Sequence, residues 1–341
     1  MGRAWPVLLA AAVIAAASGV SDSVLVPEAW VTDPVRRDNV DSLAVAAEEG
    51  LVLATTKGTH QLLVLRAATG HEVGRVGASG AKPYRMRRPN GIAVAGDRVL
   101  VVERDAARVR IFRLPALAPD GSFGEGDLRW PYGIAVTGSD DGSWRVWVTD
   151  DFDLSGPDDP ALAQRVKEYC LEIGDRGAWT AELVRTFGAM EGDGALRVVE
   201  SIAVDPEHDR LLIADEDRYL VAVYTTDGRF AGKLLGEGLL RDQPEGIALR
   251  SEGSDGIWVL TEQGPRRTTF HLYDRRSLEH VGSLSGGRTG NTDGIAVVSV
   301  PLEGFPEGAL FAVHDDRAVS AFDWRHVAAA AGLEERPLPP G

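Results

Sequence analysis

Pro131-Tyr132-Gly133-Ile134-Ala135-Val136 is one of six copies of a short phrase that decides the fold. The other copies are Val40-Asp41-Ser42-Leu43-Ala44-Val45, Pro89-Asn90-Gly91-Ile92-Ala93-Val94, Val199-Glu200-Ser201-Ile202-Ala203-Val204, Pro244-Glu245-Gly246-Ile247-Ala248-Leu249 and Thr292-Asp293-Gly294-Ile295-Ala296-Val297. Their second residues stand at 41, 90, 132, 200, 245 and 293. Most separations are therefore in the forties, which with a strand-like composition is typical of propeller blades and not of helical repeats.

A second apolar run follows each phrase, and a third follows in most copies. The second runs are Leu51–Ala54, Val99–Val102, Val146–Val148, Leu211–Ala214, Ile257–Leu260 and Leu310–Val313. Runs of this length bounded by Gly, Asp and Pro are typical of the strands of a meander. The sequence therefore predicts an all-β, six-bladed β-propeller that forms one domain.

The ring must also be closed, because an open sheet edge invites aggregation. The last phrase is followed by only two further runs before a helical stretch at 326–332. Ser23–Val31 precedes the first phrase and has no partner of its own, so we predict that it supplies the missing strand of the sixth blade. We expect the propeller to span 23–328, followed by a C-terminal tail at 329–341.

Residues 1–20 have the pattern of a secretory signal peptide. Arg3 precedes an apolar stretch from Trp5 to Ala17, and small residues follow it. We therefore expect a secreted or periplasmic protein, with no stable membrane span after signal cleavage. The chain has 51 Asp and Glu against 36 Lys and Arg, for a formal net charge of −15, which argues against a nucleic-acid partner. We expect a monomer.

Acidic residues gather at one mouth of the predicted channel. In a meander, the start of the first strand and the end of the second strand lie at the same end. The phrase starts contribute Asp41, Asn90, Tyr132, Glu200, Glu245 and Asp293, and the strand ends contribute Thr56-Lys57, Glu103-Arg104, Asp150-Asp151, Asp215-Glu216, Glu262-Gln263 and Asp315-Asp316. Carboxylates crowded together repel one another unless cations compensate them. Oxygen ligands without nearby His or Cys favour Ca²⁺.

Two basic residues, Lys57 and Arg104, interrupt this acidic set. Beside a calcium cluster they favour an anionic substrate, because such side chains bind phosphate or carboxylate oxygens. The 68-residue gap between the third and fourth phrases adds an insertion of roughly twenty residues after Asp150. That insertion is either a solvated loop or a lid with extra carboxylates at the mouth.

Several motifs in the second half resemble those of the β-propeller phytases, a family of secreted calcium-dependent phosphatases with six blades. The matching stretches are Val184-Arg185-Thr186-Phe187-Gly188, Leu211-Leu212-Ile213-Ala214-Asp215-Glu216-Asp217, Pro244-Glu245-Gly246, Asn291-Thr292-Asp293-Gly294-Ile295 and Phe311-Ala312-Val313-His314-Asp315. The resemblance implies a phytase-like phosphoric monoester hydrolase that cleaves phytate or a related phosphate ester with a metal-activated water. It implies calcium ligands at Asp41, Glu200, Glu216, Glu245 and Asp293. It also implies that Lys57 and Arg104 contact phosphate and that Tyr132 is a ligand at the mouth, so we expect Lys57, Arg104 and Tyr132 to be the catalytic residues.

Three positions depart from the family pattern. Gln243 and Gly287 stand where the family has aspartates, and the Asp150–Asp151 pair stands where it has a phosphate-contacting lysine. Two other functions therefore stay open. One is a calcium-dependent lactonase or esterase propeller, and the other is a non-catalytic binding propeller with a degenerate site.

Overall fold

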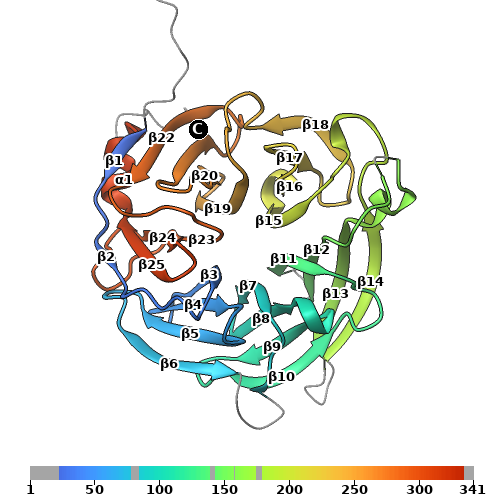
Figure 1. The fold of residues 1–341 in the computed structure, drawn as a ribbon, viewed down its shortest axis with the longest axis horizontal. Coiled ribbons are helices and arrows are strands. Elements are labelled where there is room, and N and C mark those ends of the chain that lie inside the picture. The colour runs from blue at the N-terminus through green and yellow to red at the C-terminus, as the bar shows by residue number, and fades with distance from the viewer. Residues whose placement is uncertain (1–22, 78–83, 139–142, 157, 174–178, 334–341) are drawn as a thin grey trace, which may run out of the picture.

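Six sheets are arranged as blades around a central channel, which confirms the predicted six-bladed β-propeller (Figure 1). The computed structural model describes residues 23–77, 84–138, 143–156, 158–173 and 179–333. The predicted signal peptide and most of the predicted C-terminal tail lie outside these ranges. In the part of the chain that is described, no helix is long and apolar enough to cross a bilayer.

The first three blades each contain four strands. Blade 1 consists of β3 (Val40–Ala46), β4 (Leu51–Thr56), β5 (Gln61–Arg66) and β6 (Glu72–Gly77). Blade 2 consists of β7 (Pro89–Ala95), β8 (Arg98–Glu103), β9 (Arg108–Arg113) and β10 (Ala118–Phe123). Blade 3 consists of β11 (Pro131–Gly138), β12 (Trp144–Asp150), β13 (Val166–Ile173) and β14 (Trp179–Phe187).

The last three blades continue the same order around the ring. Blade 4 consists of β15 (Val199–Asp205), β16 (Arg210–Asp215), β17 (Leu220–Tyr224) and β18 (Phe230–Leu235). Blade 5 contains β19 (Pro244–Glu252), β20 (Asp255–Glu262), β21 (Thr269–Asp274) and β22 (His280–Gly286). Blade 6 contains β23 (Ile295–Val298), β24 (Ala309–His314) and β25 (Ala318–Asp323), followed by helix α1 (Trp324–Ala330). The helix begins two residues before the predicted stretch at 326–332.

The N-terminal segment closes the ring, but not as the single strand that we predicted. Its first part, β1 (Val24–Val26), adds to blade 5 by pairing parallel with β22. Its second part, β2 (Trp30–Val31), pairs antiparallel with β25 and completes blade 6. Pro27 separates the two strands, and the Glu28 carboxylate accepts hydrogen bonds from Arg288 N at 2.8 Å and Thr289 N at 2.9 Å. The segment therefore ties two blades together.

Apolar side chains fill the space between neighbouring blades. Six buried clusters are present among the described residues, one for each pair of adjacent blades. Trp147 and Trp258 are the largest of their fully buried side chains. Burial between sheets therefore holds the ring together, in keeping with the apolar runs of the sequence.

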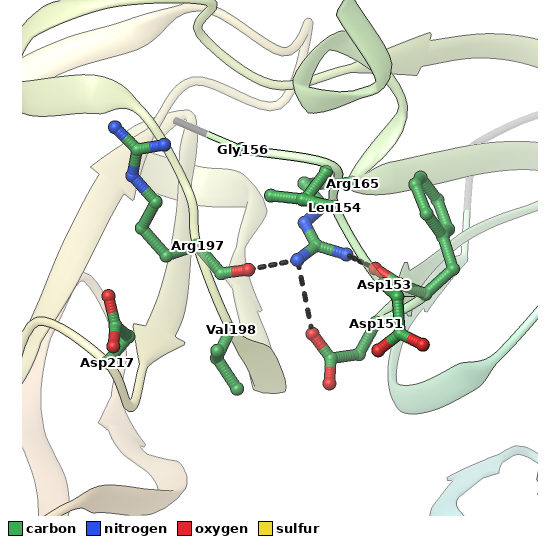
Figure 2. Close-up of a pocket in the computed structure, with 9 residues that line it drawn as sticks. Asp151, Asp153, Leu154, Gly156, Arg165, Arg197, Val198 and Asp217 are labelled. Carbon is green, nitrogen blue, oxygen red and sulfur yellow. Dashed lines mark hydrogen bonds and ion pairs between the residues drawn. The ribbon is translucent and has the colours of Figure 1, made fainter. Parts of the chain in front are cut away.

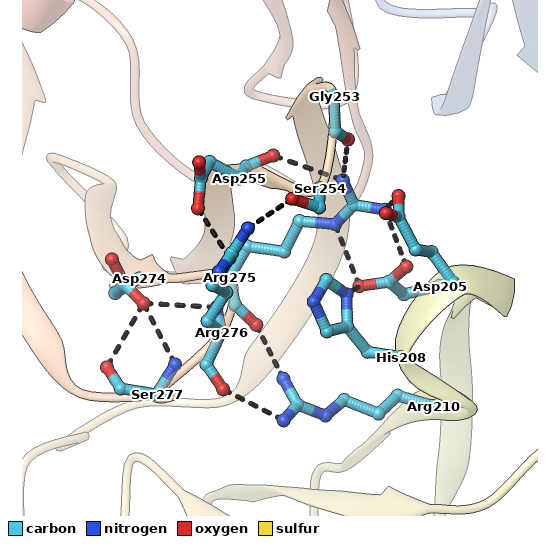
Figure 3. A network of polar contacts seen from close by, with 11 residues as sticks. Asp205, His208, Arg210, Gly253, Ser254, Asp255, Asp274, Arg275, Arg276 and Ser277 are labelled. Carbon is cyan, nitrogen blue, oxygen red and sulfur yellow. Dashed lines mark hydrogen bonds and ion pairs between the residues drawn. The ribbon is translucent and has the colours of Figure 1, made fainter. Parts of the chain in front are cut away.

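Blades 4 and 5 are also joined by a polar network around Asp205 and Arg275 (Figure 3). Asp205, at the end of β15, is fully buried and accepts hydrogen bonds from Arg275 Nε at 2.8 Å and Arg275 Nη2 at 2.6 Å. His208 Nδ1 lies 2.8 Å from the same carboxylate. Burial disfavours the charged form, but the bonds from Arg275 and His208 outweigh it and lower the pKa of Asp205. The charges of Asp205 and Arg275 are therefore paired with each other, and the network holds blades 4 and 5 together.

Candidate functional site

The six phrases form the inner strands, and a β-bulge shapes their first residues. The pairing register shifts directly after the first residue in five of these strands: β3, β7, β11, β15 and β19. A bulge bends the strand and re-aims a side chain. In these five phrases the shift spans the second and third residues, and the second is the position that we predicted to face the mouth.

Close contact between neighbouring phrases explains why the third residue of each phrase is a small one, Gly or Ser. A Cβ added to Gly133 would lie 2.2 Å from Glu200 O of the next blade, and one added to Gly294 would lie 2.4 Å from Asp41 O. Thr149 Oγ1 accepts a hydrogen bond from Gly133 N and donates one to Glu200 O, both at 2.7 Å. The second residues are therefore held in place by backbone contacts around the channel.

The two residues that end each second strand have different roles, which corrects the prediction that both face the mouth. In blades 2 to 5 the first of them is a carboxylate that accepts backbone hydrogen bonds from the loop before the phrase of its own blade. These pairs are Glu103 with Arg87 N, Asp150 with Arg129 N and Trp130 N, Asp215 with Arg197 N and Val198 N, and Glu262 with Arg241 N and Asp242 N. The ring of carboxylates at the mouth is consequently smaller than predicted.

Three predicted metal ligands come together at the mouth. Glu200, Glu216 and Glu245 each offer a carboxylate oxygen, and these oxygens all lie within 4.8 Å of one another. Glu216 and Glu245 are buried, and Glu200 is partly buried. Burial and then the charges of its carboxylate neighbours raise the pKa of Glu200 and of Glu245 well above the usual value, and burial raises that of Glu216.

The other two predicted ligands lie around Lys57. The ammonium group is 2.6 Å from Asp41 Oδ1 and 3.5 Å from Asp293 Oδ2, and the Lys57 side chain is only 9% exposed. Burial opposes its charge, but the attraction of Asp41 and Asp293 outweighs that effect and raises the pKa of Lys57. Burial and the charge of Asp41 raise the pKa of Asp293 to about 8. Lys57 therefore partly neutralises this side of the mouth.

Tyr132 contacts Lys57, whereas Arg104 contacts Asp105 and Trp130. The Tyr132 hydroxyl accepts a hydrogen bond from Lys57 Nζ at 3.4 Å. Burial and the nearby carboxylates raise the pKa of Tyr132, so its hydroxyl stays protonated. Arg104 donates to Asp105 Oδ1 at 3.0 Å, and its guanidinium carbon lies 4.3 Å from the ring centroid of Trp130. Trp130 was missed by the sequence reasoning, although its position directly before the phrase in blade 3 placed it at the rim.

The three departures from the family pattern have different surroundings. Gln243 Nε2 donates to Glu216 Oε2 at 2.8 Å. The amide therefore orients the predicted ligand Glu216. Asp150 is fully buried and forms an ion pair with Lys167 of β13. A Cβ added to Gly287 would lie 3.6 Å from Glu28 Oε2, so an aspartate there would meet another carboxylate.

The donor set fits a hard cation. Glu216 Oε1 is buried without a hydrogen-bond partner, and so are both amide atoms of the fully buried Asn90. Buried polar atoms without partners are costly, and clustered carboxylates repel one another. Calcium takes six to eight oxygen ligands from carboxylates, amide carbonyls and water. The described residues at the mouth supply ligands of these types.

Comparisons with known proteins bear on the fold and not on the chemistry. No family model matches the chain, and no curated protein matches it either. Among solved structures, hydrazine synthase of Kuenenia stuttgartiensis is 13% identical, with a TM-score of 0.50 over 82% of this chain and 75% of that chain. A streptogramin B lyase is 11% identical, with a TM-score of 0.49 over 86% of this chain and 97% of that one. A nidogen/laminin complex is 15% identical, with a TM-score of 0.48 over 72% and 79%. At these identities the similarity extends to the β-propeller fold alone.

Proposed function

We propose that this protein is a calcium-dependent phosphomonoesterase that acts at the acidic mouth. The observation that carries the proposal is the convergence of Glu200, Glu216 and Glu245 within 4.8 Å, at the end of the channel where Lys57 and Arg104 also lie. Glu216 and Glu245, which meet there, stand in stretches that resemble phytase motifs. The proposal includes export, which the signal-like pattern of residues 1–20 supports. It also includes a monomeric protein.

The carboxylates would hold the cation, and the basic side chains would hold the ester. Glu200, Glu216 and Glu245 supply the central ligands, with Asp41 and Asp293 beside them. When bound, calcium would withdraw charge from the phosphoryl oxygens and make a water molecule more acidic. Hydrolysis breaks the phosphorus–oxygen ester bond, transfers the water oxygen to phosphorus and returns a proton to the departing alcohol.

Lys57 and Arg104 stabilise negative charge on the non-bridging oxygens in this account, and the protonated Tyr132 hydroxyl donates to one of them. In the structure Lys57 is engaged by Asp41 and Asp293. If these two carboxylates turn toward a bound cation, the ammonium group becomes available to the phosphate. Cation and substrate binding should therefore depend on each other.

One assay tests the proposal directly. Purified protein is incubated with nitrophenyl phosphate and with phytate, in calcium and in excess chelator. We expect hydrolysis of at least one ester in calcium and its loss on chelation, with recovery when calcium is restored. Hydrolysis that persists in chelator, or no hydrolysis of either ester, would contradict the proposal.

A calcium-dependent lactonase is the second candidate. It is favoured by the engagement of Lys57 with two carboxylates, which leaves less positive charge for a phosphate, and by the unpartnered buried amide of Asn90. Hydrolysis of δ-valerolactone in calcium, without any phosphatase activity, would support it. Calcium binding without turnover of either substrate class would instead identify a binding propeller.

A further inference from the structure

A second cavity opens beside the acidic mouth, between blades 3 and 4. It has a volume of about 540 Å³ and is lined in part by residues that follow β12, within the insertion after Asp150 (Figure 2). Apolar walls come from Phe152, Leu154 and Val198. This volume is within the usual range for a small-molecule site.

The walls of this cavity are held in place by internal hydrogen bonds. Arg165, which is 2% exposed, donates to Asp150 O at 3.1 Å, to Phe152 O at 2.6 Å and to Arg197 O. Asp159 accepts from Ser155 N at 2.7 Å and from Ala161 N at 2.8 Å, which fixes the turn of the insertion. The cavity is therefore formed before any ligand enters.

Short backbone links connect the cavity to the candidate metal ligands. Asp151 Oδ1 accepts from Val199 N at 3.0 Å, and Val199 directly precedes Glu200. Glu216 N donates to Val198 O at 3.0 Å, and Asp217, another lining residue, directly follows Glu216. An ester whose phosphate lies at the mouth would thus place its alcohol portion beside or inside this cavity.

The free polar groups of the cavity select against a second phosphate group. Asp153 and Asp217 line the cavity and have no hydrogen-bond or ion-pair partner among the described residues, so they repel an anion. Arg165 also lines it, but its guanidinium group already donates to three backbone carbonyls. Two free carboxylates and apolar walls together suit a group with several hydroxyls and no second anionic group.

We propose that this cavity binds the hydroxyl-rich alcohol portion of a phosphate monoester, such as a sugar or polyol monophosphate. This inference rests on the proposed function, since it names the substrate class of the same site. Hydroxyl groups of the ligand donate to Asp153 and Asp217. A polyphosphorylated ring such as phytate, which carries phosphates where those hydroxyls would be, fits the cavity poorly.

The test compares glucose 6-phosphate with hexyl phosphate, which has the same number of carbon atoms but no hydroxyls. In calcium, kcat/KM for glucose 6-phosphate should exceed that for hexyl phosphate by at least about fivefold, because hydrogen bonds to charged acceptors are made only by the sugar. Asp153→Ala should lower this ratio about fivefold. Glu182→Ala, at an exposed acidic position on β14 of the same blade, is the matched control and should not change it.

Two outcomes of this comparison overturn the inference while the phosphatase proposal stands. One is a ratio near one in the wild-type protein, or a ratio that Asp153→Ala does not change. The other is faster turnover of phytate than of glucose 6-phosphate, since phytate carries the additional phosphates that the cavity should reject.

A binding measurement separates the cavity from the chemistry. Saturation-transfer NMR with free glucose needs no turnover, so it decides the case in which the protein hydrolyses no phosphate ester. A signal in the wild-type protein that is lost in the Asp153→Ala/Asp217→Ala double variant and kept in Glu182→Ala retains the cavity as a polyol site. The absence of a signal in the wild-type protein would overturn it.

Discussion

Glu200 and Glu216 reach the same point of the mouth from the start of β15 and the end of β16. They are crowded with Glu245, and burial together with the neighbouring carboxylate charges raises the pKa of Glu200 and of Glu245. Two unit charges 4 Å apart repel by about 1 kcal/mol in water and by several times more where the effective dielectric is lower. The mutual repulsion of the carboxylates destabilises the metal-free protein, and a bound cation would compensate it by attracting each of them.

Glu200→Gln should therefore act in opposite directions on the two states of the protein. It keeps the shape of the side chain but removes one negative charge, so calcium affinity should fall at least about fivefold while the metal-free protein becomes more stable. Calorimetric titration and thermal melts measure the two effects, with Glu182→Gln as the control. Unchanged calcium affinity would remove Glu200 from the site.

Lys57→Met separates the substrate from the metal. The substitution keeps much of the apolar stem but removes the ammonium group next to Asp41 and Asp293. Calcium affinity should stay equal or rise, because a repelling charge is gone, while phosphate-ester turnover should fall roughly a hundredfold. Steady-state kinetics at saturating calcium measure this. If hydrolysis is intact, Lys57 has no phosphate role and the lactonase candidate gains support.

At the scale of elements, β2 is the strand that completes the ring. Trp30 packs on Phe311 of β24, with ring centroids 5.8 Å apart, and its Nε1 donates to Ala67 O of blade 1 at 3.0 Å. One side chain therefore bridges the sixth and first blades. By contrast, β1 lies on the outer edge of blade 5, and of its residues only Val26 is buried.

Removing these strands should have graded effects. Deleting Ser23–Val31 should lower the free energy of unfolding by at least about 3 kcal/mol, the usual effect of losing a packed tryptophan. Deleting only Ser23–Val26 should cost clearly less, since Val24 and Leu25 are exposed. Chemical denaturation of the three forms measures the difference. Equal stability of the full chain and the longer deletion would show that β2 does not close the ring.

The repeated phrase made the blades predictable, because each strand carries its own apolar pattern. The apolar runs Leu51–Ala54 and Val99–Val102, for example, lie within the observed strands β4 and β8. The division of Ser23–Val31 was not predictable, because it depends on what Glu28 meets in the distant residues Arg288 and Thr289. Local pattern indicates a strand, but only the tertiary structure decides its partner.

The mouth was predictable in position but not in composition. The strand order of the meander placed Glu200, Glu216 and Glu245 at one end of the channel, and they do meet there. It could not distinguish Asp215, which caps a loop, from Glu216, which faces the mouth, since the capped N–H groups belong to residues 17 and 18 positions away. It also gave no sign that Lys57 would pair with Asp41 and Asp293.

For the whole molecule, the raised pKa values predict how stability depends on pH without metal. Carboxylates in the unfolded chain titrate near pH 4, whereas the pKa of Asp293 is about 8 and those of Glu200 and Glu245 are also raised. Between these values the folded state binds more protons at these groups, so their contribution to stability is full below about pH 4 and falls as pH rises toward 8. Chelator-treated protein should lose about 2 kcal/mol or more between pH 5 and 8, as measured by denaturation.

Calcium should flatten this profile, because a bound cation removes the cost of ionising the cluster. Gln substitutions at Glu200 and Glu245 should flatten it too, without calcium. A metal-free protein that becomes more stable from pH 5 to 8 would show that these carboxylates are already compensated in another way.

The central claim is that the acidic mouth is a calcium site, and the melting temperature of chelator-treated protein at pH 7.5 tests it most directly. A cation that binds only the folded state at 100 times its dissociation constant adds about 2.7 kcal/mol. We therefore predict that millimolar calcium raises the melting temperature by about 5 °C or more, and that Glu245→Gln removes most of the increase. The same melting temperature in calcium and in chelator would contradict the account.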